Sequence, residues 1–224
     1  MPDSGLPLVL ASSSPRRSEL LRRLGIELIV APAHVDETPW PDEAGPVHAL
    51  RVADAKADAA LVRHADHPIL AADTVVVCDG RIFGKPRDRA DAAAMLRALA
   101  GTTHVVATAV AARWQNRKAS HLEVARVTFV PFDTELYGWY LATGEGDDKA
   151  GAYAVQGQGA VLVERVEGNV QAVVGLPLAF VPGLLCRVGL RLVARGGRLD
   201  LESLAGTEGN PPSRGSSSRE GMGG

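Results

Sequence analysis

The first part of the chain alternates short apolar runs with signals for the start and end of helices. Residues 8–11 form an apolar run that is typical of a buried strand, and the pair Ser14-Pro15 follows it closely. Serine caps helix N-termini and proline suits the first helical position, so this pair predicts the start of a helix. Gly25 suits the end of that helix, and residues 26–30 again form a strand-like run. The order strand, loop, helix, strand is typical of an α/β protein.

The same kind of pattern continues along the chain. The predicted elements are a helix over 47–63, one buried strand over 69–78 that contains the polar pair Asp73-Thr74, a tight turn at Asp79-Gly80, a helix over 88–100, strands over 105–112 and 122–130, a helix from Asp133 to Gly144, strands over 152–155 and 160–166, and a last helix over 176–190 broken by Pro182-Gly183. Strands and helices alternate throughout, so we expect a mixed, twisted sheet flanked by helices.

The end of the sequence differs in composition from the rest. Residues 206–224 contain six Gly, four Ser and two Pro, with no aromatic side chain. Such a stretch buries too little apolar surface to offset the entropy lost on ordering. We therefore expect a single domain over residues 1–193 and a disordered tail over 194–224, with the disorder beginning near Arg195.

Charge and composition argue against several classes of protein. Lys and Arg number 24 against 26 Asp and Glu, a net charge of −2, so no general positive field attracts nucleic acid. The apolar runs are far shorter than the roughly 20 residues of a membrane span, and the first ten residues lack the features of a signal peptide. Cys78 and Cys186 have no CxxC partner, which suits a reducing compartment. We expect a cytoplasmic protein that binds neither nucleic acid nor membrane.

The segment 12–17, Ser-Ser-Ser-Pro-Arg-Arg, has the chemistry of an anion site. It lies between a predicted strand and a predicted helix, where hydroxyls, free backbone N–H groups and the positive end of the helix dipole meet two guanidinium groups. The alternative is an ordinary helix cap followed by solvated arginines. Composition alone does not decide between these interpretations.

Polar residues inside apolar runs give a second candidate. Asp73 interrupts a buried strand, and burying a carboxylate is costly unless it is paired or binds a metal, so a functional carboxylate is favoured. The pair Asp36-Glu37 follows another strand, although acidic residues in loops are common. Only four lysines occur, and two of them have unusual settings, Lys56 between alanines on a helix and Lys85 in a Gly-Lys-Pro loop.

Taken together, these segments resemble the Maf family of nucleotide pyrophosphatases. The resemblance covers about residues 8–190 and rests on segments in the family's order: LASSSPRRSELLRRLG, VDETP, RVADAKA, AADTVV, GKP, GDDKAGAYAVQG and VVGLPL. It implies an α/β domain with a cleft between two lobes. The implied activity is hydrolysis of a nucleoside triphosphate to the monophosphate and pyrophosphate with a divalent metal, Mg²⁺ or Mn²⁺.

The resemblance also implies roles for particular residues. The positions that match the family's phosphate-binding residues are Ser12, Arg17, Lys56 and Lys85. Glu37 matches a metal-binding carboxylate. Asp73 matches the proton acceptor, which would take a proton from a water molecule attacking the α-phosphorus.

Three further positions bear on the choice of substrate. Arg16, Thr74 and Gln156 match the branch of the family that resembles dTTP/UTP pyrophosphatases, whereas a branch acting on 7-methyl-GTP has Trp, Gln and Glu there. A glutamine side chain both donates and accepts hydrogen bonds, which suits a pyrimidine edge. The expected partner is a nucleoside triphosphate, with a homodimer left open. The alternatives are a 7-methyl-GTP-type enzyme and a nucleotide-sensing regulator of cell division or septum formation.

Overall fold

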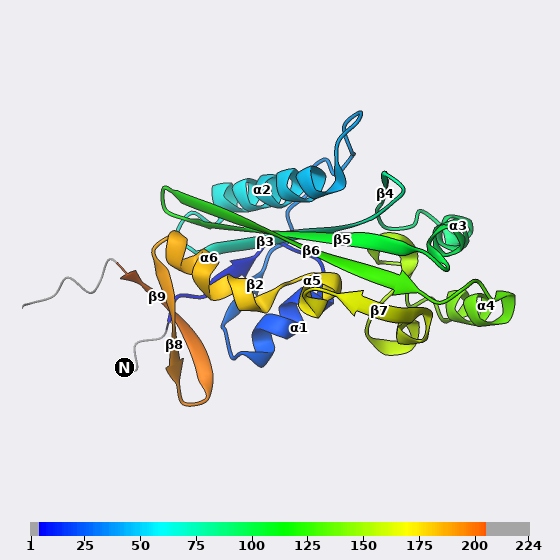
Figure 1. The fold of residues 1–224 in the computed structure, drawn as a ribbon. Coiled ribbons are helices and arrows are strands. Elements are labelled where there is room, and N and C mark those ends of the chain that lie inside the picture. Colours follow the sequence, from blue (N-terminus) through cyan, green and yellow to red (C-terminus); the bar gives the residue numbers. More distant parts are fainter. Residues whose placement is uncertain (1–4, 205–224) are drawn as a thin grey trace, which may run out of the picture.

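A central mixed sheet organises the computed structural model, which describes residues 5–204 (Figure 1). Its strands are β1 (Leu8–Leu10), β2 (Leu28–Val30), β3 (Ile69–Cys78), β4 (Arg81–Phe83), β5 (Thr103–Trp114), β6 (Arg117–Phe129) and β7 (Val163–Glu167). The order is β2-β1-β3-β5-β6-β7, and β4 pairs with β3. β1 runs parallel to β2 and β3, and all the other pairs are antiparallel. The expected mixed sheet is therefore confirmed.

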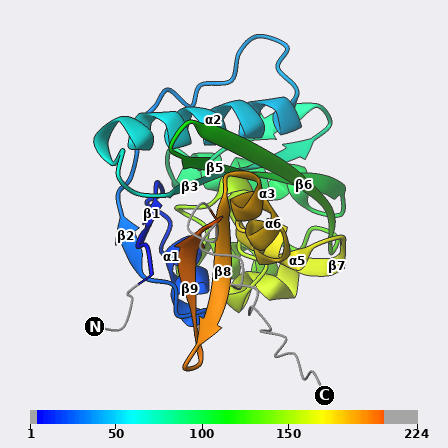
Figure 2. The ribbon, with the colours of Figure 1, turned by 90° about the vertical axis from the view of Figure 1, so that its left-hand side faces the viewer.

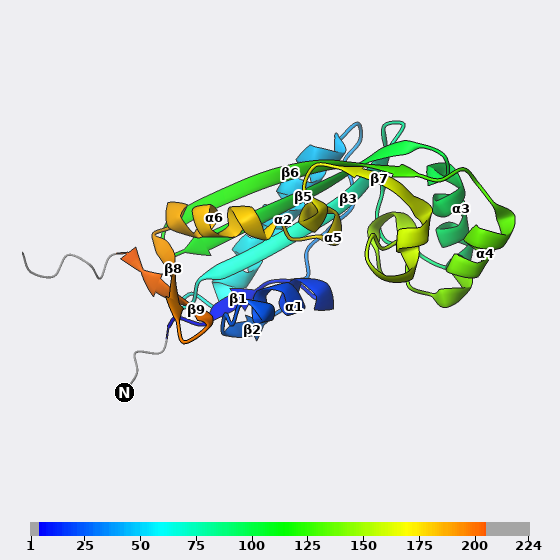
Figure 3. The same ribbon diagram turned by 60° about the horizontal axis from the view of Figure 1, so that its bottom comes forward.

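Helices cover both faces of this sheet. The α-helices are α1 (Pro15–Arg23), α2 (Gly45–Arg63), α3 (Arg89–Leu99), α4 (Thr134–Thr143), α5 (Val170–Val174) and α6 (Val181–Arg187), and the 3₁₀ helices are η1 (Ala150–Ala152), η2 (Gly157–Leu162) and η3 (Leu178–Phe180). Helix α2 lies on one face, whereas α1, α5 and α6 lie on the other (Figure 1). Helices α3 and α4 lie side by side at one end of the long strands (Figure 3). No helix among residues 5–204 is long and apolar enough to cross a membrane.

The core is divided by the sheet. Successive side chains of a strand point to opposite faces. Leu70 and Ala72 of β3 therefore pack with residues of α1 and α6, whereas Ile69 and Ala71 pack against α2, which presents alanines to the sheet. A third cluster surrounds Phe129 at the end covered by α3 and α4. Burial on both faces explains why β3 is apolar along most of its length.

Several local signals in the sequence have the expected structure. Pro15 opens α1, and Gly25 follows that helix with a φ of +75°. Asp79 and Gly80 both have positive φ, as a two-residue hairpin turn between β3 and β4 requires. Asp133 caps α4 by accepting from the N–H of Leu136 at 2.8 Å. These positions are determined locally, so the sequence predicts them well.

The strand expected over 152–155 is wrong. This segment begins in η1 and continues as a loop, and the second strand of the expected pair starts later, at β7. The phenol oxygen of Tyr140 accepts from the N–H of Ala154 at 3.0 Å, and the Glu145 carboxylate accepts from the N–H of Gly159 at 2.8 Å. Side chains from α4 and the residues after it, rather than a neighbouring strand, thus satisfy this backbone.

The single helix expected over 176–190 is also wrong. The structure has η3 and α6 there, and a further strand begins at Leu190. Pro182 lies in the first turn of α6, where a missing N–H costs nothing, so it starts this helix rather than breaking it. Asn169 caps the preceding short helix α5, which the apolar pattern did not predict.

The tail expected from residue 194 onward is wrong for its first part. Strands β8 (Leu190–Arg195) and β9 (Arg198–Ser203) form an antiparallel hairpin, which Figure 2 shows at the near end of the molecule. The hairpin is ordered because Leu190 and Leu201 are buried in the core cluster beside α6, and the N–H of Leu6 donates to the Leu201 carbonyl at 2.7 Å. The domain therefore extends beyond residue 193. The rest of the expected tail, residues 205–224, lies outside the described residues.

Candidate active site

One pocket brings together every site residue expected from the sequence. Its volume is about 830 Å³, and it is lined by the segments that follow β1 and β2, by α2 and β3, and by the segments around residues 84, 150 and 174. The expected residues on its wall are Ser12, Arg16, Arg17, Glu37, Lys56, Asp73, Thr74, Lys85 and Gln156. Residues from distant parts of the chain thus meet in one place.

Arg17 is a buried hydrogen-bond centre of this pocket. Its Nε donates to the Gly175 carbonyl at 2.8 Å, and one terminal nitrogen donates to Ser12 Oγ at 3.0 Å and to the Ala72 carbonyl at 2.8 Å. The other terminal nitrogen donates to Thr74 Oγ1 at 2.9 Å. Burial lowers the pKa of Arg17 from its ordinary value, and the charge of a nearby carboxylate opposes that shift. Four of the five guanidinium N–H groups are therefore already used within the protein.

The Arg17 contacts continue into a buried chain of hydroxyls. Thr74 Oγ1 lies 2.8 Å from Thr108 Oγ1, and the Thr108 hydroxyl donates to the Ala172 carbonyl at 2.7 Å. Because Thr108 uses its proton on that carbonyl, the Thr74 hydroxyl donates to Thr108 and accepts from Arg17. Sequence reasoning missed Thr108, whose one signal is a polar residue in the apolar run of β5, directly opposite Thr74 in the sheet.

Lys56 connects two carboxylates at the wall of the pocket. Its Nζ lies 2.7 Å from Asp73 Oδ1 and 2.9 Å from Glu37 Oε1. The Lys56 and Asp73 side chains are almost fully buried, whereas Glu37 is 53% exposed. Asp73 faces α2 and its neighbour Thr74 faces α1, as expected for successive residues of a strand. The partner that a buried carboxylate requires is therefore Lys56.

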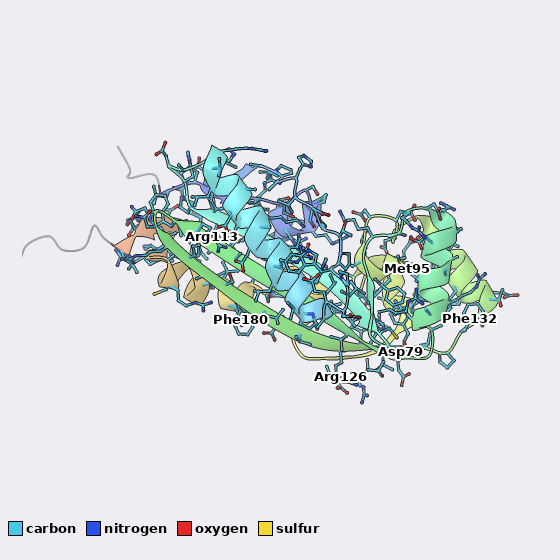
Figure 4. All side chains as sticks on the ribbon, turned by 90° about the horizontal axis from the view of Figure 1, so that it is seen from above. Asp79, Met95, Arg113, Arg126, Phe132 and Phe180 are labelled. Atoms are coloured by element: carbon cyan, nitrogen blue, oxygen red, sulfur yellow. The ribbon has the colours of Figure 1, made fainter. Side chains whose placement is uncertain are left out.

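Helix α2, which carries Lys56, is fixed to the sheet by a second ionic cluster. Buried Arg113 of β5 donates to Asp54 Oδ1 and to Asp58 Oδ1, both at 2.6 Å. Figure 4 looks onto α2 from above and labels Arg113 near one end of the helix. Two ion pairs to one face of α2 restrict its rotation, so they also restrict the direction of Lys56.

Comparison with known proteins identifies the family. The family described as Maf-like protein matches residues 7–188. The chain belongs to the Maf family. A relative from Anaeromyxobacter dehalogenans named dTTP/UTP pyrophosphatase is 51% identical over 191 residues, which are 83% of this chain and 95% of the relative. A relative of the same name from Myxococcus xanthus is 46% identical over 185 residues, 83% of this chain and 94% of the relative.

In this Maf protein, the segment that carries Glu37 is attached to α2 by Glu43. The Glu43 carboxylate accepts from Arg51 at 2.6 and 2.8 Å and from the backbone N–H of Trp40 at 3.1 Å, and it lies 2.9 Å from His48 Nδ1. The Arg51 hydrogen bonds are the main cause that lowers the pKa of Glu43 to about 2. Sequence reasoning missed this cluster, because acidic and basic residues at such spacing are common on protein surfaces.

The other polar residues of the pocket are more exposed. Arg16 lies 3.9 Å from the Asp148 carboxylate, and Lys85 and Gln156 are exposed. Lys149, which sequence reasoning did not select, also lines the pocket, and its ammonium donates to Asp148 at 2.5 Å and to the Glu145 carbonyl. The only hint of Lys149 in the sequence is its position within the GDDKAGAYAVQG segment.

The donors near Lys56 fit a hard divalent cation in part. Within residues 5–204, no three His, Cys, Asp or Glu side chains form a cluster that could hold a metal ion by themselves. Glu37 and Asp73 nevertheless bring two carboxylates to one ammonium group. Mg²⁺ commonly takes one or two protein carboxylates and completes its shell with water and substrate phosphate. The donor set therefore suits a metal that arrives with a nucleotide.

Proposed function

We propose that this Maf protein is a pyrophosphatase that hydrolyses dTTP and UTP to the monophosphate and pyrophosphate. The observation that carries the proposal is a single pocket whose wall holds the buried carboxylate of Asp73 and cationic side chains from separate segments: Arg16, Arg17, Lys56, Lys85 and Lys149. The cations suit a triphosphate, and the carboxylate suits a general base. The names of the relatives support the choice of nucleotide.

In the proposed reaction, Asp73 accepts a proton from a water molecule whose oxygen attacks the α-phosphorus. The bond from that phosphorus to the oxygen bridging to the β-phosphorus breaks, and pyrophosphate leaves with the electron pair. Ser12 and Lys85 bind phosphate oxygens. Arg17 contributes its charge and its remaining N–H, because its other N–H groups are engaged within the protein.

Lys56 orients the Asp73 carboxylate through their 2.7 Å contact. Glu37, on the other side of the ammonium group, would hold a divalent cation, Mg²⁺ or Mn²⁺, with Asp73 beside it. Such a cation, when bound, neutralises charge on the phosphate oxygens and on the departing pyrophosphate. Positioning and charge stabilisation account for the rate in this proposal, without a covalent intermediate.

The substrate selection that we propose depends on Arg16, Thr74 and Gln156, which line the same pocket. Thr74 acts through Arg17, since its hydroxyl is already bonded on both sides. We further propose that the pocket is a cleft between two lobes of the domain and that the protein works in the cytoplasm, where its two free cysteines would stay reduced.

The test is a screen of the purified protein against UTP, dTTP, CTP, ATP, GTP and 7-methyl-GTP, with pyrophosphate measured separately from orthophosphate. We expect pyrophosphate and monophosphate from dTTP and UTP, and loss of activity with a metal chelator. A nucleoside diphosphate with orthophosphate as first products would reject the mechanism. A profile led by 7-methyl-GTP would favour the other branch, and binding without hydrolysis would favour a nucleotide sensor.

A further inference from the structure

The segment that carries Gln156 has no strand partner and depends on two side chains for its shape. Residues 153–156 lie between η1 and η2, and within residues 5–204 no hydrogen bond is made by the exposed Gln156 side chain. The place from which that side chain can reach a base is therefore set by the position of its backbone. We call residues 153–159 the Gln156 loop.

Glu145, two residues after α4, holds the part of the loop that follows Gln156 in the sequence. Its Oε1 accepts from the backbone N–H of Gln158 at 3.0 Å, and its Oε2 accepts from that of Gly159 at 2.8 Å. Gly157 has a φ of +83°, and a Cβ at that position would lie 2.2 Å from Glu145 Oε1. The loop thus wraps the carboxylate closely, so any other side chain at residue 157 would displace the Glu145 carboxylate and strain the backbone.

Tyr140 holds the part of the loop that precedes Gln156 in the sequence. Its phenol oxygen accepts from the backbone N–H of Ala154 at 3.0 Å. Tyr140 is only 1% exposed, so water does not readily replace its oxygen as the acceptor for Ala154. Tyr140 and Glu145 therefore hold the backbone before and after Gln156, each through its own hydrogen bonds.

We propose that Tyr140 and Glu145 are positioning residues for nucleobase selection, acting through the backbone of the Gln156 loop. This inference rests on the proposed function, because it takes Gln156 as the side chain that reads the pyrimidine edge. A glutamine amide can offer its oxygen or its NH₂ group to a base, so discrimination requires that the amide be held in one orientation. UTP and CTP are similar in size but differ at two positions of the base. Uracil donates at N3 and accepts at the 4-position, whereas cytosine accepts at N3 and donates at the 4-position.

Helix α4 provides a matched control. Tyr137 lies one turn before Tyr140, is 3% exposed, and donates its hydroxyl to the Val130 carbonyl at 2.9 Å. Tyr137→Phe removes an equally buried hydroxyl from the same helix without touching the Gln156 loop. Any general effect of losing a buried tyrosine hydroxyl should appear in both Tyr140→Phe and Tyr137→Phe.

The experiment measures kcat/KM for UTP and CTP in the wild type, Tyr140→Phe, Glu145→Gln and Tyr137→Phe. We expect the UTP-to-CTP ratio to fall about tenfold in the first two variants, as for the loss of an oriented hydrogen bond, and to stay at the wild-type value in Tyr137→Phe. In a Gln156→Ala background, Tyr140→Phe should cause no further fall in the ratio. Equal ratios in Tyr140→Phe and wild type, or additive losses in the double variant, would overturn the inference.

Amide hydrogen exchange separates this inference from the proposed function, because it needs no substrate. Exchange should be faster at residue 154 in Tyr140→Phe, and at residues 158 and 159 in Glu145→Gln, than in wild type and in Tyr137→Phe. Thermal unfolding confirms that each variant is folded. Unchanged exchange would overturn the inference whatever the activity. A different outcome is faster exchange in both variants together with a wild-type protein that does not hydrolyse UTP. That outcome would reject the proposed function and support the role of both residues in holding the loop.

Discussion

Replacing Arg17 by lysine should destabilise the protein strongly. Lysine keeps the charge but has its three N–H groups on one nitrogen, whereas Arg17 donates from three nitrogens around the edge of its planar guanidinium to Ser12 Oγ, the Ala72 carbonyl, Thr74 Oγ1 and the Gly175 carbonyl. We expect at least two of these acceptors to lose their partner. Each unpaired buried group costs about 1 to 3 kcal/mol, so the loss is about 2 to 6 kcal/mol against a typical total of about 5 to 15.

The free energy of unfolding in urea measures this loss, and Arg16→Lys is its control. Arg16 is adjacent in sequence and partly exposed, and its ion pair with Asp148 is long, at 3.9 Å, so its replacement should change stability by no more than about 0.5 kcal/mol. If Arg17→Lys unfolds at the same urea concentration as Arg16→Lys but loses activity, the reasoning fails. Arg17 would then serve as a phosphate ligand without stabilising the fold.

Three further predictions concern the reaction rate, the choice of substrate and the pH dependence of stability. Asp73→Asn should lower kcat about 10² to 10⁴-fold with the fold retained, and wild-type turnover at saturating metal would exclude Asp73 as the base. Gln156→Glu should reduce the preference for dTTP and UTP, measured as kcat/KM ratios against ATP and GTP; unaltered ratios would contradict it. Burial lowers the pKa of His104 from 6.5 to about 4, so the unfolded chain takes up this proton first and stability should fall as pH drops between these values. His104→Gln should show a smaller fall in urea titrations over that range, and an equal fall would assign the effect to other groups.

Much of the fold could be predicted because its signals are local. The helix start at Pro15, the Asp79-Gly80 turn and the apolar stretch of β3 each determine their own conformation within a few residues. Ser14 stands at the N-cap position, but its side chain makes no cap hydrogen bond. The hairpin of β8 and β9 also had a signal, since Gly196-Gly197 separates two runs and Leu199 and Leu201 alternate with polar residues. This signal was missed because the Gly- and Ser-rich residues 206–224 led us to expect one disordered tail from residue 194 onward.

The shape of the site could not be predicted in the same way. Residues 152–155, which overlap the start of the Gln156 loop, have an apolar composition that suits a strand, but tertiary hydrogen bonds from Tyr140 and Glu145 determine the course of the loop. Thr108 likewise resembles any other threonine of a strand until its position opposite Thr74 is known. The sequence suggested which residues meet in the pocket. It did not show that most N–H groups of Arg17 donate to acceptors within the protein.

The contact between Arg17 and Gly175 has a consequence for synthesis of the protein. The two residues are 158 positions apart, so the acceptor for Arg17 Nε emerges only when most of the chain has been translated. A nascent chain that stops before Gly175 leaves this guanidinium without one of its anchors and lacks part of the pocket wall. We therefore expect N-terminal fragments to be inactive, which would keep a ribosome-bound chain from hydrolysing cellular nucleotides before its domain is complete.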